Sequence, residues 1–344
     1  MAIVQKLAVQ NVRSHQSITI DLSPNTTVIT GLNGSGKTTL LESLYIALQG
    51  TSFKGSDKDV LQNEKDWWRI DIMFSDEQKR SIKFDPSRTT GRKQFIIDSK
   101  TNYRMLPKHK HPVVLFEPED LRLLNGSPTR RRQFIDRFIT QLDPQYGVAL
   151  RKYERALKQR NNLLKQGMAS DDELFAWDIT LSEYGAYIIE QRSIFIEKIN
   201  LKLNDAYNDI AETKDTVSTH YSHTFIGDIK QKLLNELQTH LYRDKIVGNT
   251  SVGPHRHDML FLFNNNPALS VASRGEVRTI ILALKFLEVE IIEQLTNIKP
   301  LILLDDVFSE LDETRQARLH TGNYQIIITT TENRSIPQAK EIKL

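Results

Sequence analysis

Apolar residues alternate with polar ones in several short segments of the first 110 residues. The alternation covers residues 70–74, 82–84 and 95–97, and polar turns such as residues 75–78 separate these segments. A period of two is typical of strands that bury one face. The pattern therefore predicts an antiparallel meander, and two shorter strands are expected before it, between residues 3 and 21.

Four further segments are rich in apolar and β-branched residues almost throughout, at residues 27–30, 113–116, 301–304 and 325–331. Such runs are typical of strands buried on both faces, as in the parallel sheets of α/β proteins.

Apolar residues three or four positions apart predict helices in three parts of the chain. These are residues 39–48, a long stretch from 127 to about 210, and residues 277–292. The long stretch predicts a helical insertion, whereas residues 241–266 return to an extended pattern.

Residues 31–38 fit the phosphate-binding pattern Gly-x4-Gly-Lys-[Ser/Thr], between the expected strand and the expected helix. Glycines let backbone N–H groups turn toward a phosphate, and the helix adds its positive dipole end. We expect Lys37 to face solvent in the empty site and to reach the outer phosphates, and Thr38 to offer a hydroxyl to Mg²⁺. A loop that only caps the helix would explain the glycines but not the Lys-Thr pair. The predicted nucleotide contacts here are Gly31, Asn33, Gly34, Ser35, Gly36, Lys37, Thr38 and Thr39.

Asp305 and Asp306 directly follow the apolar run at residues 301–304. The carboxyl end of a buried strand is where open α/β sheets bind ligands. We expect Asp305 to hold Mg²⁺, directly or from the second coordination shell, and Asp306 to polarise an attacking water. Lys37 and Asp306 are thus the predicted catalytic residues. The two aspartates could alternatively cap a following helix, a choice that is even on this motif alone but favours the ion site beside a P-loop.

Charge is unevenly distributed along the 344 residues, which leave room for two domains or one domain with a large insertion. The net charge of +3 is too small to indicate a nucleic-acid partner. However, residues 79–110 hold ten Lys and Arg against two Asp, and residues 128–168 hold ten against three acids. Both segments are candidate contacts to a DNA backbone, although exposed helices and strands often carry such residues merely as solvated faces.

The chain contains no cysteine, which excludes disulfides, zinc fingers and thiol nucleophiles. Neither a secretory leader nor an apolar run of bilayer length is visible, so we expect a cytoplasmic protein without a membrane partner.

Two motifs in the last hundred residues leave alternatives open. His255, His257 and Asp258 carry metal-ligating groups, but alternate strand residues point to opposite faces and no further ligands gather, so a metal site is disfavoured. Ser273 and Gly275 precede an apolar helix, where they would either contact a phosphate or form a capping box in which Ser273 pairs with Glu276. On spacing alone the cap is favoured.

Taken together, the P-loop, residues 273–276, Asp305-Asp306 and residues 309–312 resemble the Walker A, signature, Walker B and D-loop motifs of ABC-type ATPase heads in SMC-like DNA-repair proteins. The long coiled coil of those proteins has no counterpart here. The sequence resembles instead the RecF family, their compact bacterial members, over essentially its full length and in order. The matching motifs include residues 31–45, 116–121, 126–132, 253–256 and, most specifically, 303–312.

This resemblance implies an α/β fold: an ABC-type ATPase head, in which a P-loop sheet is joined to an antiparallel β meander, plus an α-helical lobe. The implied division is residues 1–112 for the first part of the nucleotide-binding lobe, residues 113–245 for the helical lobe, and residues 246–344 for the part that completes the head.

The resemblance also implies a weak, DNA-stimulated ATPase with ATP and Mg²⁺ as cofactors. Arg13, Ser273 and Gly275 join the expected nucleotide contacts, the last two reaching ATP held by a second subunit. An ATP-bound homodimer would clamp double-stranded DNA beside single-stranded gaps, at the nucleoid, and would help RecO and RecR to load RecA.

Three departures from the family pattern concern the mechanism. The signature reads Ser-Arg-Gly-Glu-Val at residues 273–277 in place of Ser-Gln-Gly-Gln-Gln, His257 stands where an aspartate is usual, and residues 329–331 would have to serve for a missing switch histidine. The alternatives are another SMC-like ATPase, such as an anti-phage nuclease partner, or, less favoured, the ATPase subunit of an ABC transporter.

Overall fold

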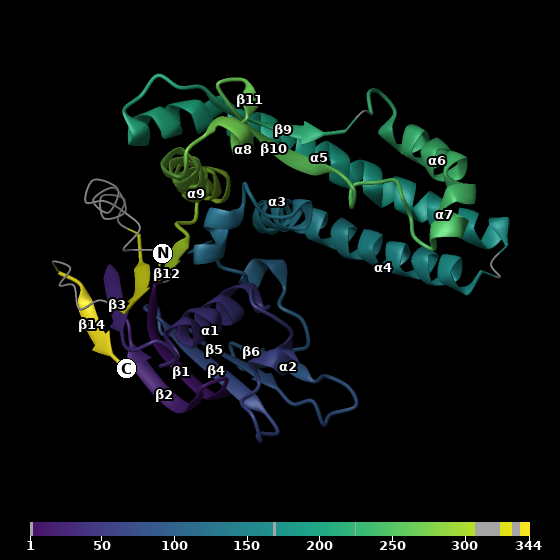
Figure 1. The fold of residues 1–344 in the computed structure, drawn as a ribbon. Coiled ribbons are helices and arrows are strands. Elements are labelled where there is room, and N and C mark those ends of the chain that lie inside the picture. Colours follow the sequence, from purple (N-terminus) through teal and green to yellow (C-terminus); the bar gives the residue numbers. More distant parts are fainter. Residues whose placement is uncertain (1–2, 168–169, 224, 307–323, 332–337) are drawn as a thin grey trace. The chain divides into compact units, whose positions relative to one another are not determined.

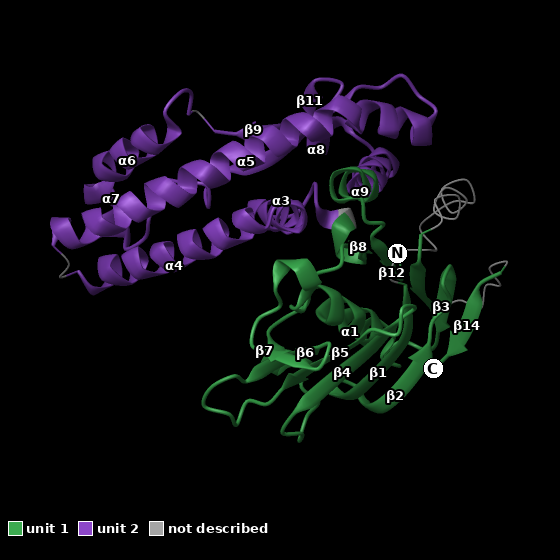
Figure 2. Cartoon of the chain, turned by 180° about the vertical axis from the view of Figure 1, so that it is seen from behind, with its two compact units in different colours: residues 1–120, 289–344 green, residues 121–288 purple. Residues whose placement is uncertain are grey.

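The computed structural model describes residues 3–167, 170–223, 225–306, 324–331 and 338–344. Figure 1 shows the elements in chain order. The chain forms two compact units, described separately below: residues 1–120 with 289–344, and residues 121–288 (Figure 2). The three-part division expected from the sequence stays a prediction. In the described part of the chain, no helix is long and apolar enough to cross a membrane.

The first unit contains a five-stranded sheet in which every neighbouring pair is parallel. Its strands, in sheet order, are β14 (Lys340–Lys343), β3 (Thr26–Thr30), β13 (Ile326–Thr330), β12 (Leu301–Asp305) and β8 (Val113–Phe116). Every residue of β3, β8, β12 and β13 is buried, which confirms the prediction drawn from their apolar composition. Strand β13 lies between β3 and β12, so the P-loop strand and the aspartate strand are next-nearest neighbours.

A six-stranded antiparallel sheet belongs to the same unit. Its strands, in sheet order, are β2 (His15–Asp21), β1 (Val4–Val12), β4 (Trp68–Phe74), β5 (Lys79–Phe84), β6 (Lys93–Ile97) and β7 (Lys100–Asn102). On β4 each alternate side chain is buried, from Trp68 to Phe74, as the period of two requires. The predicted meander is confirmed.

Helix α1 (Lys37–Gln49) contacts strands of both sheets (Figure 1). All its residues except Thr38 are buried, because the two sheets cover it on different sides. The helix ends at Gly50, whose φ of 85° is the left-handed conformation that closes a helix without strain only at glycine. Three short elements complete the connections of this unit: α2 (Asp57–Val60), η1 (Pro107–His109) and η2 (Pro118–Arg122), the last of which runs across the boundary of the two units.

The second unit is mainly helical, as predicted for residues 127–210. Its helices are α3 (Pro128–Leu142), α4 (Pro144–Gln166), α5 (Asp171–Ala211), α6 (Ile229–Thr239), α7 (Leu241–Val247) and α8 (Ala268–Val271). A small antiparallel sheet of β9 (Val217–Ser222), β10 (Asp258–Phe263) and β11 (Asn266–Pro267) joins them. Helix α9 (Arg274–Thr296) begins in this unit and ends in the first.

The extended pattern expected for residues 241–266 is confirmed only at β10 and β11: residues 252–256 form bends and a turn, and α7 forms at the start of the segment. Asp244, on α7, is fully buried and accepts a 2.7 Å hydrogen bond from Arg160, while Gly248 closes the helix with a φ of 71°. Tyr242 and Ile246 are exposed on this helix. The Arg160–Asp244 ion pair anchors this helix to α4, a tertiary contact that local periodicity cannot reveal.

Candidate nucleotide-binding site

The loop between β3 and α1 uses glycine where other residues would be strained or would clash. Gly34 and Gly36 have φ values of 82° and 95°. A Cβ on Gly36 would also lie 2.3 Å from Nε2 of His15 and 2.5 Å from Oγ of Ser14. No side chain caps the N-terminus of α1 at Gly36. The positive end of α1 thus faces the loop with its first N–H groups open to an anion.

Lys37 is buried, with 4% of its surface exposed, so the expectation that it faces solvent is wrong. Its Nζ donates hydrogen bonds to the carbonyl oxygens of Gly31 and Leu32, at 2.9 and 3.2 Å. The loop wraps around the ammonium group because those carbonyls replace the water that the charge would otherwise need. The charge is therefore held at the centre of the loop before any phosphate arrives.

Thr38 and Asp305 are brought together although 267 positions separate them in the chain. The Thr38 hydroxyl donates to Oδ1 of Asp305 at 2.8 Å, and Thr329 donates to the same oxygen at 2.9 Å. Oδ2 of Asp305 lies 3.9 Å from Nζ of Lys54. Burial raises the pKa of Asp305, while the hydrogen bonds from both threonines oppose that shift.

This pair has the chemistry that Mg²⁺ requires. A threonine hydroxyl and a carboxylate are hard oxygen ligands, and Mg²⁺ usually takes only one or two protein ligands beside phosphates and water. Thr38 and Asp305 would hold the ion, and the roles predicted for them stay predictions.

Asp306 has a φ of 52°, a left-handed conformation that is uncommon for residues other than glycine. Its N–H lies 3.1 Å from Oγ1 and 3.2 Å from the carbonyl oxygen of Thr329. This contact turns the chain sharply at the end of β12, immediately after Asp305. Strain of this kind is concentrated at functional sites, where neighbouring contacts hold it in place.

Thr329 therefore touches both predicted aspartates, and sequence reasoning had assigned it only a substitute role for a switch histidine. The role of Thr329 becomes visible only when the order of the strands in the sheet is known. Because β13 pairs with β12 in parallel register, Thr329 lies directly opposite Asp305.

Arg13, in the turn between β1 and β2, is held by Glu42 of α1. Its guanidinium donates to both carboxylate oxygens, and the Nη2 to Oε1 distance is 2.8 Å. Glu42 is fully buried and also accepts from Ser52. The hydrogen bond to Glu42 raises the pKa of Arg13. Glu42 was missed by sequence reasoning, and a contact between Arg13 and nucleotide stays a prediction.

Ser273 begins α9 with a capping box. Its N–H donates to Oε2 of Glu276 at 2.6 Å, and its Oγ accepts from the Glu276 N–H at 3.3 Å. The cap favoured by the sequence is thus present, and it uses the hydroxyl as an acceptor only. The exposed Ser273 hydroxyl can still donate to another group. Gly275 lies in the exposed first turn of the same helix. Residues 309–312, the expected D-loop, lie outside the described residues.

The histidines that raised the question of a metal site are engaged in hydrogen bonds. His255 lies 2.7 Å from the Tyr153 hydroxyl and 3.0 Å from the Thr250 carbonyl, and His257 lies 3.1 Å from the Tyr221 hydroxyl. Asp258 pairs with the buried Arg131 at 2.7 Å. These side chains hold the second unit together.

The P-loop threonine meets an aspartate at the end of another strand of the parallel sheet, and the antiparallel sheet covers the other side of the P-loop helix. This arrangement defines the head of an ABC-type ATPase. Comparison with known proteins agrees. The family model described as an AAA domain matches residues 6–246. A structure of an SMC head bound to the winged-helix domain of ScpA is 15% identical with a TM-score of 0.51, which supports the fold alone.

Closer relatives identify the family. The chain is 35% identical over 343 residues to the DNA replication and repair protein RecF of Streptococcus agalactiae, covering 95% of this chain and 91% of that protein. The RecF of Lachnoclostridium phytofermentans is 33% identical, covering 96% and 92%. A structure of the recombination mediator protein RecF-ATPrS in the RecFOR pathway has a TM-score of 0.89 at 28% identity, covering 100% of this chain and 96% of that one. The chain belongs to the RecF family of DNA replication and repair proteins.

Proposed function

We propose that this protein binds ATP with Mg²⁺, hydrolyses it weakly with stimulation by DNA, and uses the bound nucleotide to close a homodimer on double-stranded DNA beside single-stranded gaps. The observation that carries the proposal is the 2.8 Å hydrogen bond between Thr38 and Asp305, because it joins a P-loop hydroxyl to a strand-end carboxylate. A structure of RecF-ATP, 29% identical with a TM-score of 0.87, supports ATP as the nucleotide.

The residues of the site divide the work of phosphoryl transfer. Lys37 would exchange its two carbonyl partners for phosphate oxygens, and the open N–H groups of α1 would hold the same phosphates. Thr38 and Asp305 would hold Mg²⁺, which when bound neutralises charge on the phosphate oxygens. Asp306, positioned by Thr329, would orient and polarise the attacking water. Thr329 also fixes the carboxylate of Asp305, so one threonine serves both aspartates.

ATP would act as a dimerising ligand if its phosphates, held by the P-loop of one subunit, also accepted a hydrogen bond from a donor on another. The Ser273 hydroxyl, already fixed by its capping box, would supply that donor from a second subunit. Arg274 and Glu276 are close enough to Ser273 to change how strongly nucleotide drives dimerisation.

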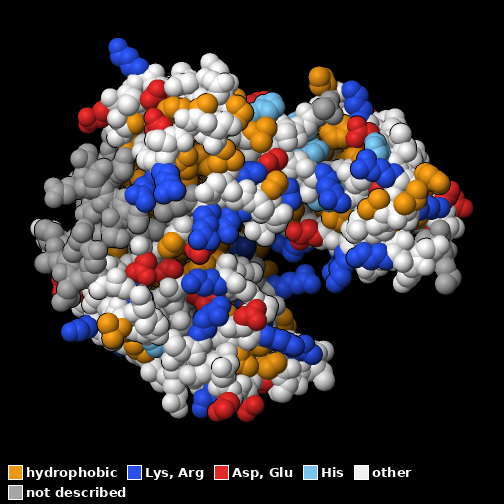
Figure 3. All heavy atoms as spheres, viewed as in Figure 1, with side chains coloured by type: hydrophobic (Ala, Val, Ile, Leu, Met, Phe, Trp, Pro, Cys, Tyr) orange, Lys and Arg blue, Asp and Glu red, His pale blue; other side chains and the backbone are white. Residues whose placement is uncertain are grey.

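Several basic residues remain as candidate DNA contacts, but fewer than the sequence suggested. Arg80 is buried and donates to the Ala47 carbonyl, and Arg160 is fully buried between Asp178 and Asp244. Together with Arg131, these arginines stabilise the fold. Figure 3 shows many other Lys and Arg side chains at the surface. A dispersed set of exposed cations is suited to a DNA backbone without sequence preference.

The partners RecO, RecR and RecA belong to this proposal as well. Their support is the family itself and the RecFOR pathway in which the two similar structures were placed. A protein with this function would work in the cytoplasm, at the nucleoid.

Binding to gapped, duplex and single-stranded DNA, each with and without ATP, tests the proposal. We expect ATP to strengthen duplex and gapped binding, with affinity that falls steeply as salt rises, because each neutralised phosphate releases counterions. Binding that ignores ATP, or that depends on base sequence, would contradict it.

A further inference from the structure

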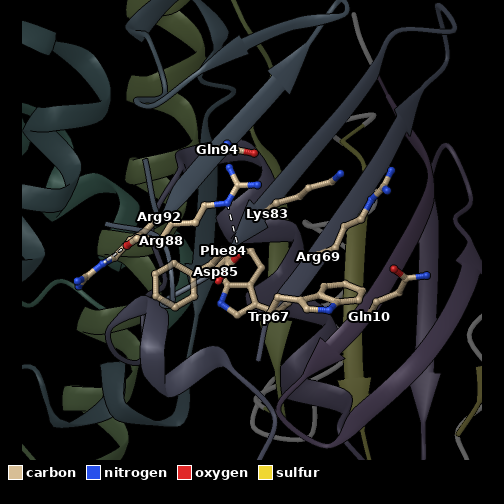
Figure 4. Close-up of a pocket in the computed structure, with 10 residues that line it drawn as sticks. Gln10, Trp67, Arg69, Lys83, Phe84, Asp85, Arg88, Arg92 and Gln94 are labelled. Carbon is tan, nitrogen blue, oxygen red and sulfur yellow. Dashed lines mark hydrogen bonds and ion pairs between the residues drawn. The ribbon is translucent and has the colours of Figure 1, made fainter. Parts of the chain in front are cut away.

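A cavity of about 220 Å³ opens on the outer face of the antiparallel sheet (Figure 4), and none of its lining residues belongs to the nucleotide site. Its lining includes Trp67, Arg69, Lys83, Arg88 and Arg92. Four cationic side chains and the exposed ring of Trp67 thus line the cavity. Asp85 is the one carboxylate among the lining residues.

The cavity floor is a row of polar side chains that crosses four strands. Gln10 pairs with Arg69, Arg69 with Lys83, and Lys83 with Gln94 in the register of β1, β4, β5 and β6. Directly paired residues project from the same face of a sheet. Figure 4 shows these side chains standing on that face. Two cations therefore stand side by side at the centre of the sheet, placed by backbone hydrogen bonds.

Trp67 precedes Arg69 by two residues, so it lies beside this row, and it is 43% exposed, whereas the next residue, Trp68, is fully buried. Trp68 uses its indole N–H to bond the Asp57 carbonyl and stacks on Phe84. The alternation of strand side chains explains why one tryptophan points into the core and the other outward. A large aromatic ring left half exposed beside a cavity is a feature of binding surfaces.

The cations of the cavity differ in how far they are already engaged. Arg69 pairs with Asp71 at 2.7 Å, and Arg88 lies 3.3 Å from Asp85. Arg92 uses its Nε to donate to the Arg88 carbonyl, which leaves its terminal nitrogens for other acceptors. Within the described residues, Lys83 has no hydrogen-bond or ion-pair partner. An anionic ligand would supply the missing acceptors.

We propose that this cavity binds an unpaired nucleobase of single-stranded DNA, with the base stacked on Trp67 and the flanking phosphates on Lys83 and Arg92. A duplex would not fit this description, because its base faces are covered by stacking and only an unpaired base can present one to an indole. The inference rests on the proposed DNA-binding function and adds to it a separate contact for the single-stranded side of a gap.

The test compares an oligonucleotide of 20 thymidines with an abasic strand of the same length and charge, by fluorescence anisotropy with the full chain. Trp67→Ala should weaken binding of the thymidine strand by about fivefold or more, since base stacking on an aromatic ring has about that value, and should leave the abasic strand unaffected. Lys83→Gln should weaken both strands and lower the salt dependence by about one counterion.

Matched controls separate the cavity from general effects. Lys79→Gln removes the same charge four residues away on the same face of β5, outside the cavity, and should cost less than Lys83→Gln. Tyr242→Ala removes another exposed aromatic ring, in the second unit, and should change neither strand. Trp67→Phe keeps an aromatic ring and should retain most of the preference for the thymidine strand over the abasic strand. That result would assign the loss in Trp67→Ala to the missing ring.

The outcomes are distinct. Equal losses on both strands, or none on either, for Trp67→Ala would overturn the base site. Equal effects of Lys79→Gln and Lys83→Gln would overturn the phosphate contacts of the cavity. An acidic peptide that binds in a Trp67-dependent manner while DNA does not would show that the ligand class is wrong. ATP-dependent duplex binding is measured in parallel with every variant. If the base site is overturned but ATP-dependent duplex binding persists, the proposed function still holds. If the unaltered protein shows no ATP-dependent duplex binding, the proposed function is refuted.

Discussion

Replacing Lys37 by methionine should remove the effect of ATP on stability while leaving the protein folded. The side chain is buried, and its Nζ is bonded to the carbonyls of Gly31 and Leu32. Methionine keeps most of the length of lysine but leaves both carbonyls without their donor. The loss of these hydrogen bonds costs about 1–3 kcal/mol, which lowers the melting temperature by about 2–12 °C in a domain of this size.

The expected stabilisation by ATP has a similar magnitude. The melting temperature without ATP therefore cannot by itself distinguish the loss of nucleotide binding from the loss of these hydrogen bonds. A ligand at 100 times its Kd stabilises the folded state by about 2.7 kcal/mol. We therefore expect ATP with Mg²⁺ to raise the melting temperature of the unaltered protein by about 5–10 °C and that of Lys37→Met by almost nothing. The diagnostic quantity is the difference between melting curves recorded with and without ATP.

Two control variants show whether the effect is specific to the charge and position of Lys37. Lys58→Met removes an exposed lysine of the same unit and should keep the full ATP effect. Lys37→Arg keeps a charge at the site, so a folded but unresponsive arginine variant would indicate that geometry matters as well as charge. If Lys37→Met were stabilised by ATP as much as the unaltered protein, the phosphate site would be elsewhere and the reasoning would be refuted.

Three further predictions concern the other parts of the site. Asp306→Asn should bind ATP but hydrolyse it at least about tenfold more slowly in a phosphate-release assay, and an unchanged rate would move the water-polarising role to another residue. Ser273→Arg should cost about 1 kcal/mol of helix capping and abolish ATP-driven dimerisation in sedimentation, whereas its mixture with Lys37→Met should form a partial dimer population, because together they assemble one intact composite site. Burial raises the pKa of Asp305 above its usual 3.8. In the absence of metal, the folded protein therefore loses stability as the pH rises from 3.8 through the raised pKa, because the carboxyl group must ionise in a buried position. Magnesium requires the ionised form, so Mg²⁺-dependent ATP binding, followed by calorimetry, should weaken as the pH falls toward that raised value, and Asp305→Asn should abolish this dependence.

The sequence by itself determined the elements whose pattern is local. Buried strands such as β12 and the alternating strands of the meander follow from a run or a period that side-chain burial enforces within a few residues. The P-loop follows from glycines that a left-handed φ requires, and the capping box at Ser273 from a spacing of three residues. Each of these depends on neighbours along the chain, so composition and spacing were enough.

Only the tertiary structure decided which of these elements meet. The order of the parallel sheet, with β13 between β3 and β12, brings Thr329 to Asp305 and Thr38 to the same carboxylate. Burial likewise turned Lys37 inward and formed α7 around the pair of Arg160 with Asp244. These outcomes depend on side chains from distant segments competing for the same space and for the same hydrogen bonds, and no local pattern in the sequence records that competition.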